Sequence, residues 1–539
     1  MVKIKLSALA CAILVGGGQL VAEDFYIVNI NNETKIITGH PWESSINVDN
    51  NGTLISRVSE FRGPTDININ NSKAIFENRI AIRNPHLHII NNSTLDFNEE
   101  LTMWDGDGLW PVIEKDNDFS GGNLSLDNNS TLDVKGEAEF DRIDVLINGS
   151  TATIDNLTNY DSKIYVVNDS ELKINKDALF VRSHLIVKDD SNATINGALS
   201  VVSDYTIDEN DEFVVNDGGI KIDKSNLNVE GEVQFYNVDT ELNNSSIANF
   251  KDKLTLFDSA MLLKNGSSLN VEGEVNFDNS ALVVQNGSKV MFNDKFTMRN
   301  RDEKSIIILT IKDHEHPFER MKNEVEKSII ILDNGSEINI KGDFENHGVI
   351  YYGASADSAP KITVDGKATL MGTTEIGIYA TSGDISNLNQ AVFLESKGAI
   401  ENQATDENIY AMYFDPDNED ANAEGLVKYD QNIIDADLKL SEDGKKLLVQ
   451  ILMSGDMQNR PINEKIDFIA ESTQAAGVNL TAQDLDIITS LFTMGDAKGN
   501  GAIATEAIKL ADQAKQGNQE AAQIISKTAQ SIQKNSQDS

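Results

Sequence analysis

Short pairs of apolar residues recur along this chain at a nearly constant interval. In each pair two apolar residues flank a single residue of another type, and a turn rich in Asn, Gly or Ser precedes the pair. Successive pairs lie 20 or 21 residues apart over two long stretches. The pairs are Leu95/Phe97, Leu132/Val134, Ala152/Ile154, Leu172/Ile174, Ala193/Ile195, Leu227/Val229, Ala248/Phe250, Leu269/Val271, Val290/Phe292, Ile338/Ile340 and Ile362/Val364. A fixed period of this length indicates a solenoid, in which identical structural units stack on one another.

Each pair fits one short β-strand, because residues i and i+2 of a strand point to the same face. Turns such as Asn265-Gly266 supply the positive φ that a corner requires, although the same dipeptide also closes hairpins. The interval favours the corner, since one turn of a parallel β-helix needs about three short strands, whereas a meander repeats every two. We therefore predict a mainly β chain, a right-handed parallel β-helix solenoid with a C-terminal α-helical tail. Stacked Asn amides and a Phe column through Phe140, Phe235 and Phe277 are expected in it.

Composition limits how such a repeat can be used. The 539 residues include 45 Lys+Arg against 86 Asp+Glu, a formal charge of −41, and 57 Asn. A chain this acidic and rich in Asn could be disordered, but its alternating apolar runs argue for a folded repeat. The charge also excludes a basic surface for nucleic acid, so no nucleic acid is expected among its partners.

The N-terminus has the pattern of a secretory signal peptide. Lys3 and Lys5 precede an apolar run, and the segment ends at Ala22 before acidic residues, which predicts cleavage after Ala22. Cys11, the only cysteine, lies in this apolar run. We interpret it as an ordinary apolar residue of the signal-peptide core and not as a lipidation site. We expect export through the periplasm to the cell surface, the outer membrane or the medium.

The C-terminal region changes from strand patterns to helix patterns. Asp443-Gly444 joins two alternating runs and therefore predicts a hairpin. Further on, Thr481-x-x-Asp484 resembles a capping box at the start of a helix, and an apolar helical face follows.

Together these features resemble the passenger region of bacterial autotransporters, the type V secreted surface proteins. The resemblance rests on the export signal, the acidic chain without further cysteine, the Asn-Gly-Ser-x-Leu-x-Val repeats and the closing strand-turn-strand. It implies a signal peptide (1–22), a β-helix passenger with irregular inserts (23–377), a capping or autochaperone-like β module (378–455) and a helical linker or tail (456–539). Autotransporters end in a membrane β-barrel, whereas here the last stretch has helical patterns. Either the barrel is missing because the gene is truncated or split, or this passenger works without one.

Residues with catalytic potential are sparse in the repeat. The middle residue of a pair faces outward, and no three neighbours are acidic among Asp96, Asp133, Thr153, Lys173, Thr194, Asn228, Asn270, Met291, Asn339 and Thr363. The sequence has neither a Gly-x-Ser-x-Gly elbow nor a His-Glu-x-x-His motif. We expect no catalytic residue, no cofactor and no bound metal, and hence no enzyme. This expectation is based on one of the three outward faces of the repeat.

A His-rich segment interrupts the repeat. His314-Glu315-His316 could bind a metal from a strand, but no third ligand accompanies the pair. We interpret the segment as a surface excursion in which Glu319–Lys327 forms a short helix.

One possible ligand platform lies near the N-terminus. Trp104 and Trp110 flank Asp105 and Asp107, and flat rings beside carboxylates would suit a glycan. The favoured alternative is that these rings, with Trp42, shield the end of the solenoid as a cap.

The function expected from these features is that of an adhesin or surface interaction protein. Its partners would be glycans or proteins of host or bacterial cell surfaces, and possibly a separately encoded outer-membrane β-barrel. An exported β-helix polysaccharide lyase or hydrolase, and a two-partner secreted exoprotein, are the alternatives.

Overall fold

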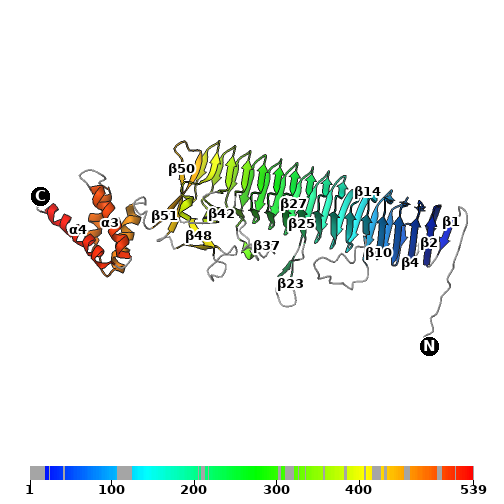
Figure 1. Ribbon diagram of the computed structural model, residues 1–539, viewed down its shortest axis with the longest axis horizontal. Helices are drawn as coiled ribbons and strands as arrows, with labels where there is room; N and C mark the ends of the chain where they lie inside the picture. The colour runs from blue at the N-terminus through cyan, green and yellow to red at the C-terminus, as the bar shows by residue number, and fades with distance from the viewer. Residues whose placement is uncertain are drawn as a thin grey trace, which may run out of the picture.

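Most of the chain forms long ladders of parallel β-strands, and helices follow near the C-terminus (Figure 1). The computed structural model describes all residues except 1–18, 23–24, 40–42, 106–123, 204, 208–212, 216–217, 301–304, 310–320, 326, 334, 356–357, 382–384, 406–407, 415–425, 430–433, 454–461, 494–499, 516–517 and 538–539.

The strands stack in three parallel ladders, called I, II and III, which the chain visits in this order again and again. One visit to all three is called a rung. Ladder I comprises β2 (Phe25–Asn31), β4 (Glu43–Asp49), β7 (Thr65–Asn70), β10 (Pro85–Ile90), β13 (Leu124–Asp127), β15 (Val145–Asn148), β17 (Lys163–Val167), β20 (His184–Lys188), β25 (Gly219–Asp223), β28 (Asp239–Asn243), β31 (Ala260–Leu263), β34 (Ala281–Val284), β39 (Ile329–Leu332), β42 (Val349–Ala354), β45 (Glu375–Ala380) and β48 (Ile409–Phe414).

Ladders II and III lie in one continuous sheet. Ladder II comprises β1 (Gln19–Ala22), β3 (Thr34–Gly39), β5 (Thr53–Ser56), β8 (Lys73–Phe76), β11 (Thr94–Phe97), the first parts of β14 (Thr131–Asp141) and β16 (Thr151–Tyr160), β18 (Glu171–Ile174), β21 (Asn192–Ile195), β26 (Asn226–Val229), β29 (Ile247–Phe250), β32 (Ser268–Val271), β35 (Lys289–Phe292), β40 (Glu337–Ile340), β43 (Lys361–Val364) and β46 (Val392–Ser396). Ladder III comprises β6 (Glu60–Phe61), β9 (Ile80–Arg83), β12 (Leu101–Trp104), the second parts of β14 and β16, β19 (Ala178–Val181), β22 (Leu199–Val202), β27 (Val233–Tyr236), β30 (Leu254–Phe257), β33 (Val275–Asp278), β36 (Phe296–Arg299), β41 (Phe344–Asn346), β44 (Ala368–Leu370) and β47 (Ile400–Asn402).

The predicted repeat is the register of ladder II. Leu132 pairs with Ala152 and Val134 with Ile154, and the same correspondence continues through the later pairs. Both members of every predicted pair are buried, so the apolar residues line the interior as expected.

Aromatic side chains fill part of this interior. Phe140, Phe235 and Phe277 occupy one inward column of ladder III, as predicted, but they alternate with other residue types, so they do not stack directly. Direct ring stacking occurs instead between neighbouring rungs at Phe76 and Phe97, with centroids 4.8 Å apart.

Buried serines hold the corner between ladders I and II together. The backbone N–H of Gly52 donates to the Oγ atom of Ser72 one rung on, and the same bond is repeated without a break to Ser246. Each of these serines is buried. A second serine ladder, from Ser162 to Ser183 and from Ser259 to Ser328, follows the corner between ladders III and I. Each corner therefore obtains its buried polar partner from the next rung.

Asparagine side chains form the amide ladders predicted from the sequence. Asn68 donates to Asn47 at 3.0 Å, and Asn47 donates to Asn29 at 3.1 Å. Many corner asparagines, such as Asn128 and Asn265, have positive φ, which Asn tolerates better than most residues.

The three longest inserts between ladder strands all join ladder III to ladder I. They are residues 106–123 before β13, 204–217 before β25 and 301–327 before β39. From β13 to β25 and from β25 to β39 the distance is four rungs, about 19 Å at the usual strand spacing. The second and third inserts contain antiparallel hairpins, β23 (Tyr205–Ile207) with β24 (Phe213–Val215) and β37 (Ser305–Leu309) with β38 (Met321–Val325). Both hairpins hang on the same side of the stack in Figure 1.

The helix predicted at Glu319–Lys327 is wrong, because Met321–Val325 is the strand β38. Met321 and Val325 are four residues apart, which imitates a helical face. The apolar strand β37 lies just upstream, and its antiparallel pairing with β38 outweighs that local pattern.

Antiparallel strands follow the last parallel rungs. The predicted hairpin is confirmed: β50 (Ile434–Leu440) pairs with β51 (Lys446–Met453) around Gly444, whose φ is +68°. β51 also pairs with β46, and β49 (Leu426–Lys428) pairs with β48. The 3₁₀ helix η1 (Ile385–Leu388) precedes β46.

The helices are α1 (Ile462–Ala475), α2 (Ala482–Thr493), α3 (Asn500–Lys515) and α4 (Gln519–Gln537). They share an apolar core that includes Ile469, Ile508 and Ile525. The predicted capping box is present: Asp484 accepts a hydrogen bond from the Thr481 backbone at 2.9 Å, and Thr481 Oγ1 accepts one from the Asp484 backbone at 3.1 Å.

Most of the predicted signal peptide, residues 1–18, lies outside the described residues, and β1 lies within its last part. Among the helices that the structure describes, none has the length and apolar character needed to cross a bilayer.

The serine ladder predicts a cost for Ser170→Ala. Ser170 Oγ accepts the backbone N–H of Ser150 at 3.2 Å, so the alanine variant leaves that buried donor without a partner. We expect the free energy of unfolding to fall by about 1–3 kcal/mol in urea denaturation. Ser268→Ala, at a half-buried outward position of β32, is the matched control and should change it by less than about 0.5 kcal/mol. Equal effects in the two variants would contradict a structural role for the ladder.

Candidate functional site

The structure places two of the four residues predicted as a ligand platform. Trp104 is the last residue of β12, half-buried and outward-facing, and Asp105 follows at the corner with ladder I. Asp107, Trp110 and the proposed cap residue Trp42 lie outside the described residues.

Trp104 belongs to a column of outward side chains that runs along the edge of ladder III. Trp104 is in register with Arg83 on one side and Asp141 on the other. The column continues through Tyr160, Val181, Val202, Tyr236 and Phe257 to Asp278 and Arg299. Between Asp141 and Asp278 it is therefore apolar or aromatic over five consecutive rungs.

A second outward column lies two residues earlier on the same strands. It presents Thr158, Leu179, Ser200, Gln234 and Thr255. With the five edge residues, these make ten outward positions without a charged side chain, which we call the neutral face. All ten are half-buried except Thr255, which is buried. Charged residues border it, with Glu139 one rung before and Asp278 one rung after.

Two rings of the neutral face stack on each other. Tyr236 and Phe257 have centroids 4.7 Å apart and planes inclined by only 12°. Each ring covers a face of the other, so the pair extends the apolar strip along the stack and leaves ring edges toward solvent.

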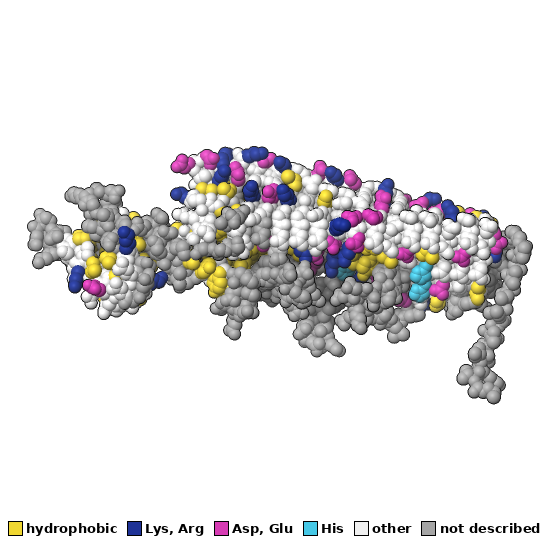
Figure 2. All heavy atoms as spheres, in the orientation of Figure 1, with side chains coloured by type: hydrophobic (Ala, Val, Ile, Leu, Met, Phe, Trp, Pro, Cys, Tyr) yellow, Lys and Arg dark blue, Asp and Glu magenta, His cyan; other side chains and the backbone are white. Residues whose placement is uncertain are grey.

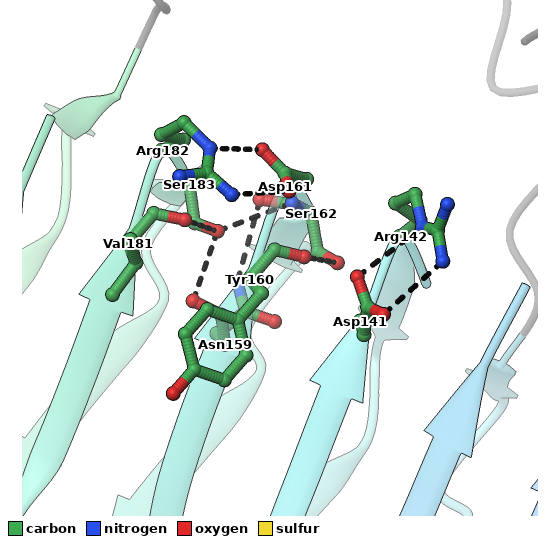
Figure 3. Close-up of polar contacts among 9 residues, drawn as sticks. All are labelled: Asp141, Arg142, Asn159, Tyr160, Asp161, Ser162, Val181, Arg182 and Ser183. Atoms are coloured by element: carbon green, nitrogen blue, oxygen red, sulfur yellow. Dashed lines mark hydrogen bonds and ion pairs between the residues drawn. The ribbon is translucent and has the colours of Figure 1, made fainter. Parts of the chain in front are cut away.

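A network of polar contacts fixes the corner beside this strip (Figure 3). Arg182 binds Asp161 of the preceding rung through two hydrogen bonds of 2.6 and 2.8 Å. Ser183 Oγ donates to the carbonyl of Asn159 at 3.1 Å and accepts the backbone N–H of Ser162. The corner charges are thus paired with each other and aligned along the edge, so the adjacent strip keeps its apolar character.

Elsewhere charges are paired between rungs. Lys73 contacts Asp96 and Lys251 contacts Glu272, each at 2.6 Å. Figure 2 shows basic and acidic side chains lying beside one another along the upper edge of the stack. Exposed pairs of this kind contribute little stability, but they reduce repulsion between neighbouring rungs of an acidic chain.

A different cluster of reactive side chains lies on the outer face of ladder I near the last rungs. Glu375 accepts a hydrogen bond from Tyr410 at 3.3 Å and forms an ion pair with Lys327. The ammonium of Lys428, on β49, lies 3.5 Å from the centroid of the Tyr410 ring. Burial lowers the pKa of Lys428, and burial with the nearby Tyr351 and Glu375 raises the pKa of Tyr410.

Gly377 provides the space for this cluster. A Cβ atom at Gly377 would lie 2.6 Å from Met412 Sδ and 2.7 Å from Tyr351 Cδ1, closer than real contacts allow. The rings of Tyr351 and Tyr410 can therefore meet across the rung that Gly377 occupies, and they join an apolar cluster with Leu426 of β49. The cluster fastens the antiparallel strand β49 to the parallel stack.

Within the described part of the chain, no group of three or more His, Cys, Asp or Glu side chains is arranged to hold a metal ion. His314, Glu315 and His316 lie outside that part.

The neutral face was missed in the sequence because only the middle residues of the ladder II pairs were assigned to an outward face. The signal was present as alternation in short runs such as Ala178–Val181 and Val233–Tyr236. The insert at 204–217 shifts the period between these runs, so their register becomes visible only when the rungs are stacked.

Asp333 is a buried carboxyl at the end of β39. Its Oδ1 atom has no hydrogen-bond partner among the described residues, and the backbone N–H of Asn286 donates to its carboxylate. Burial raises the pKa of Asp333 to about 7.

This shift predicts that stability falls as pH rises. Between about pH 4 and pH 7 folded Asp333 keeps a proton that the unfolded chain has lost, so raising the pH through this window favours unfolding. We expect the contribution to reach a few kcal/mol by pH 7, and Asp333→Asn to remove it. Urea denaturation at a series of pH values measures both.

Asp365→Asn is the contrasting control, because ion pairs with Lys397 and Lys341 lower the pKa of Asp365. Its folded carboxylate stabilises the protein above the ordinary carboxyl pKa, and this contribution is lost as pH falls through the lowered value. An unchanged pH slope in Asp333→Asn would contradict the assignment to Asp333.

Comparisons of this chain with protein-family models, with curated proteins and with solved structures gave no match.

Proposed function

We propose that the three ladders are the faces of a right-handed parallel β-helix with a helical C-terminal tail, and that this chain is an exported surface interaction protein of the autotransporter passenger type. On this proposal it acts as an adhesin and holds its contact segments along a rigid axis.

The observation that carries this proposal is the placement of the inserts. Residues 106–123, 204–217 and 301–327 all join ladder III to ladder I, and successive inserts are four rungs apart. The ladder strands on either side of each insert keep their register, so the stack tolerates segments of different length at this corner. Repeated segments on one side of a rigid body suit multivalent contact with a surface, in which several weak contacts add through avidity.

The experiment removes the inserts one by one in a strain that produces this protein. Each insert is replaced by the tight corner of an uninterrupted rung, Asp258-Ser259, which already joins ladder III to ladder I. We expect attachment to host or sibling cells to fall several-fold with one insert removed and to reach the level of the gene deletion with all three removed, since avidity is multiplicative.

Surface exposure of each variant, measured by protease accessibility on intact cells, is the control for export and folding. Attachment that is unchanged in the gene deletion would contradict the adhesin function. N-terminal sequencing of the exported chain tests the predicted cleavage after Ala22 in the same material.

A second function has one observation in its favour, the Tyr410, Glu375 and Lys428 cluster. Burial lowers the pKa of Lys428, so this amine loses its proton, and can act as a base, more readily than an exposed lysine. Lys428 would take the C5 proton of a uronic acid residue while the C4–O4 bond breaks, leaving a C4=C5 double bond, and O4 would take a proton from water. Incubation with polygalacturonate should then release unsaturated ends, and Lys428→Met should abolish the release. No unsaturated product from the intact protein would exclude this activity on polygalacturonate.

A further inference from the structure

We propose that the neutral face binds a linear, uncharged glycan whose chain lies along the stacking axis. This assignment rests on the proposed function, because it names the partner class of a surface interaction protein. The site consists of the outward residues of the second part of β16 and of β19, β22, β27 and β30.

The two columns of the face have complementary chemistry for a sugar chain. The edge column offers apolar and aromatic side chains from Tyr160 to Phe257, and the other column offers hydroxyl and amide groups at Thr158, Ser200 and Gln234. The columns are about 7 Å apart, since they are two residues apart along each strand. A pyranose ring has the same division, with apolar C–H groups on its faces and hydroxyl groups on its rim.

Charge selects against the other polymers that could lie on this surface. None of the ten outward side chains is charged, in a chain whose formal charge is −41. An acidic glycan finds no cation on the face and is repelled by the protein as a whole. A basic peptide finds one carboxylate at the first rung only, that of Glu137, which accepts a hydrogen bond from Thr158 at 3.1 Å. A neutral chain loses nothing by leaving water for this surface, provided that its hydroxyl groups find partners.

The geometry of the face suits a polymer better than a small ligand. The five rungs are in register and separated by about 4.8 Å, so the face is about 19 Å long. The length per sugar of an extended chain of pyranose rings is similar to the spacing between rungs. Successive sugars can therefore contact equivalent side chains on successive rungs. The hairpin β23–β24 leaves the stack just after Val202 and so begins beside the middle of this face.

The experiment measures binding of cellohexaose, maltohexaose and mannohexaose to the full exported chain by titration calorimetry, with a galacturonic acid hexamer as the acidic probe. We expect saturable binding of at least one neutral hexamer and none of the acidic one. Gln234→Glu, which adds a charge without changing shape, should weaken binding at least tenfold, and Tyr236→Ser with Phe257→Ser should do the same.

Matched variants on ladder II of the same rungs are the controls. Asn226→Asp adds a charge on β26, in the rung of Gln234, and Ile247→Ser removes an exposed apolar side chain from β29, in the rung of Phe257. Both should bind as the parent does. Circular dichroism and the thermal midpoint confirm that each variant is folded.

Three results would overturn the assignment: no binding of any neutral hexamer, equal binding in Gln234→Glu and Asn226→Asp, or a dimer that Tyr236→Ser with Phe257→Ser converts to monomers. The last would make the strip a contact between two copies of this chain. Glycan binding by a protein whose gene deletion leaves attachment unchanged would support the neutral face and contradict the adhesin function, so the two proposals fail separately.

Discussion

The fold depends on backbone donors that a rung cannot satisfy by itself. At the corner between ladders I and II the N–H of one serine is bonded to the hydroxyl of the serine one rung later, from Ser72 to Ser246. Because these groups are buried, a missing or shifted rung would leave donors without partners, and the register is fixed as firmly as by the strands. The outward side chains of the neutral face accept none of these corner bonds, so this face is free to differ from the others in charge and polarity.

Sequence reasoning succeeded where a local pattern and the three-dimensional stack agree. The ladder II pairs and the Asp443-Gly444 hairpin were predictable because a period of two and a tight turn are encoded within a few residues. The serine ladder was not predicted, since a serine at a corner rich in Asn and Asp resembles any turn residue until its neighbour one rung away is known. Glu319–Lys327 was misassigned because the partner strand of Met321–Val325 lies beyond the window in which its pattern was judged.

The candidate site was only partly predictable for the same reason. Trp104 and Asp105 stood out by residue type, and the structure places Trp104 in the edge column but separates it from the neutral face by Asp141. Tyr160, Val181 and Phe257 are unremarkable in the sequence and gain meaning only as neighbours in one column. The Tyr410 and Lys428 cluster likewise joins residues from different strands through the space left at Gly377.

The three longest inserts share one corner of the stack. The number of rungs and the sequences of these inserts can therefore change separately. A duplicated rung lengthens the stack without altering any insert, because the new corner and strands repeat those of its neighbours. An exchanged insert alters what is presented without altering the core, since the ladder strands on both sides keep their register. On the proposed function, reach and specificity can therefore change independently during evolution, and an engineer could graft foreign peptides at residues 204–217 or 301–327 at a chosen distance from either end.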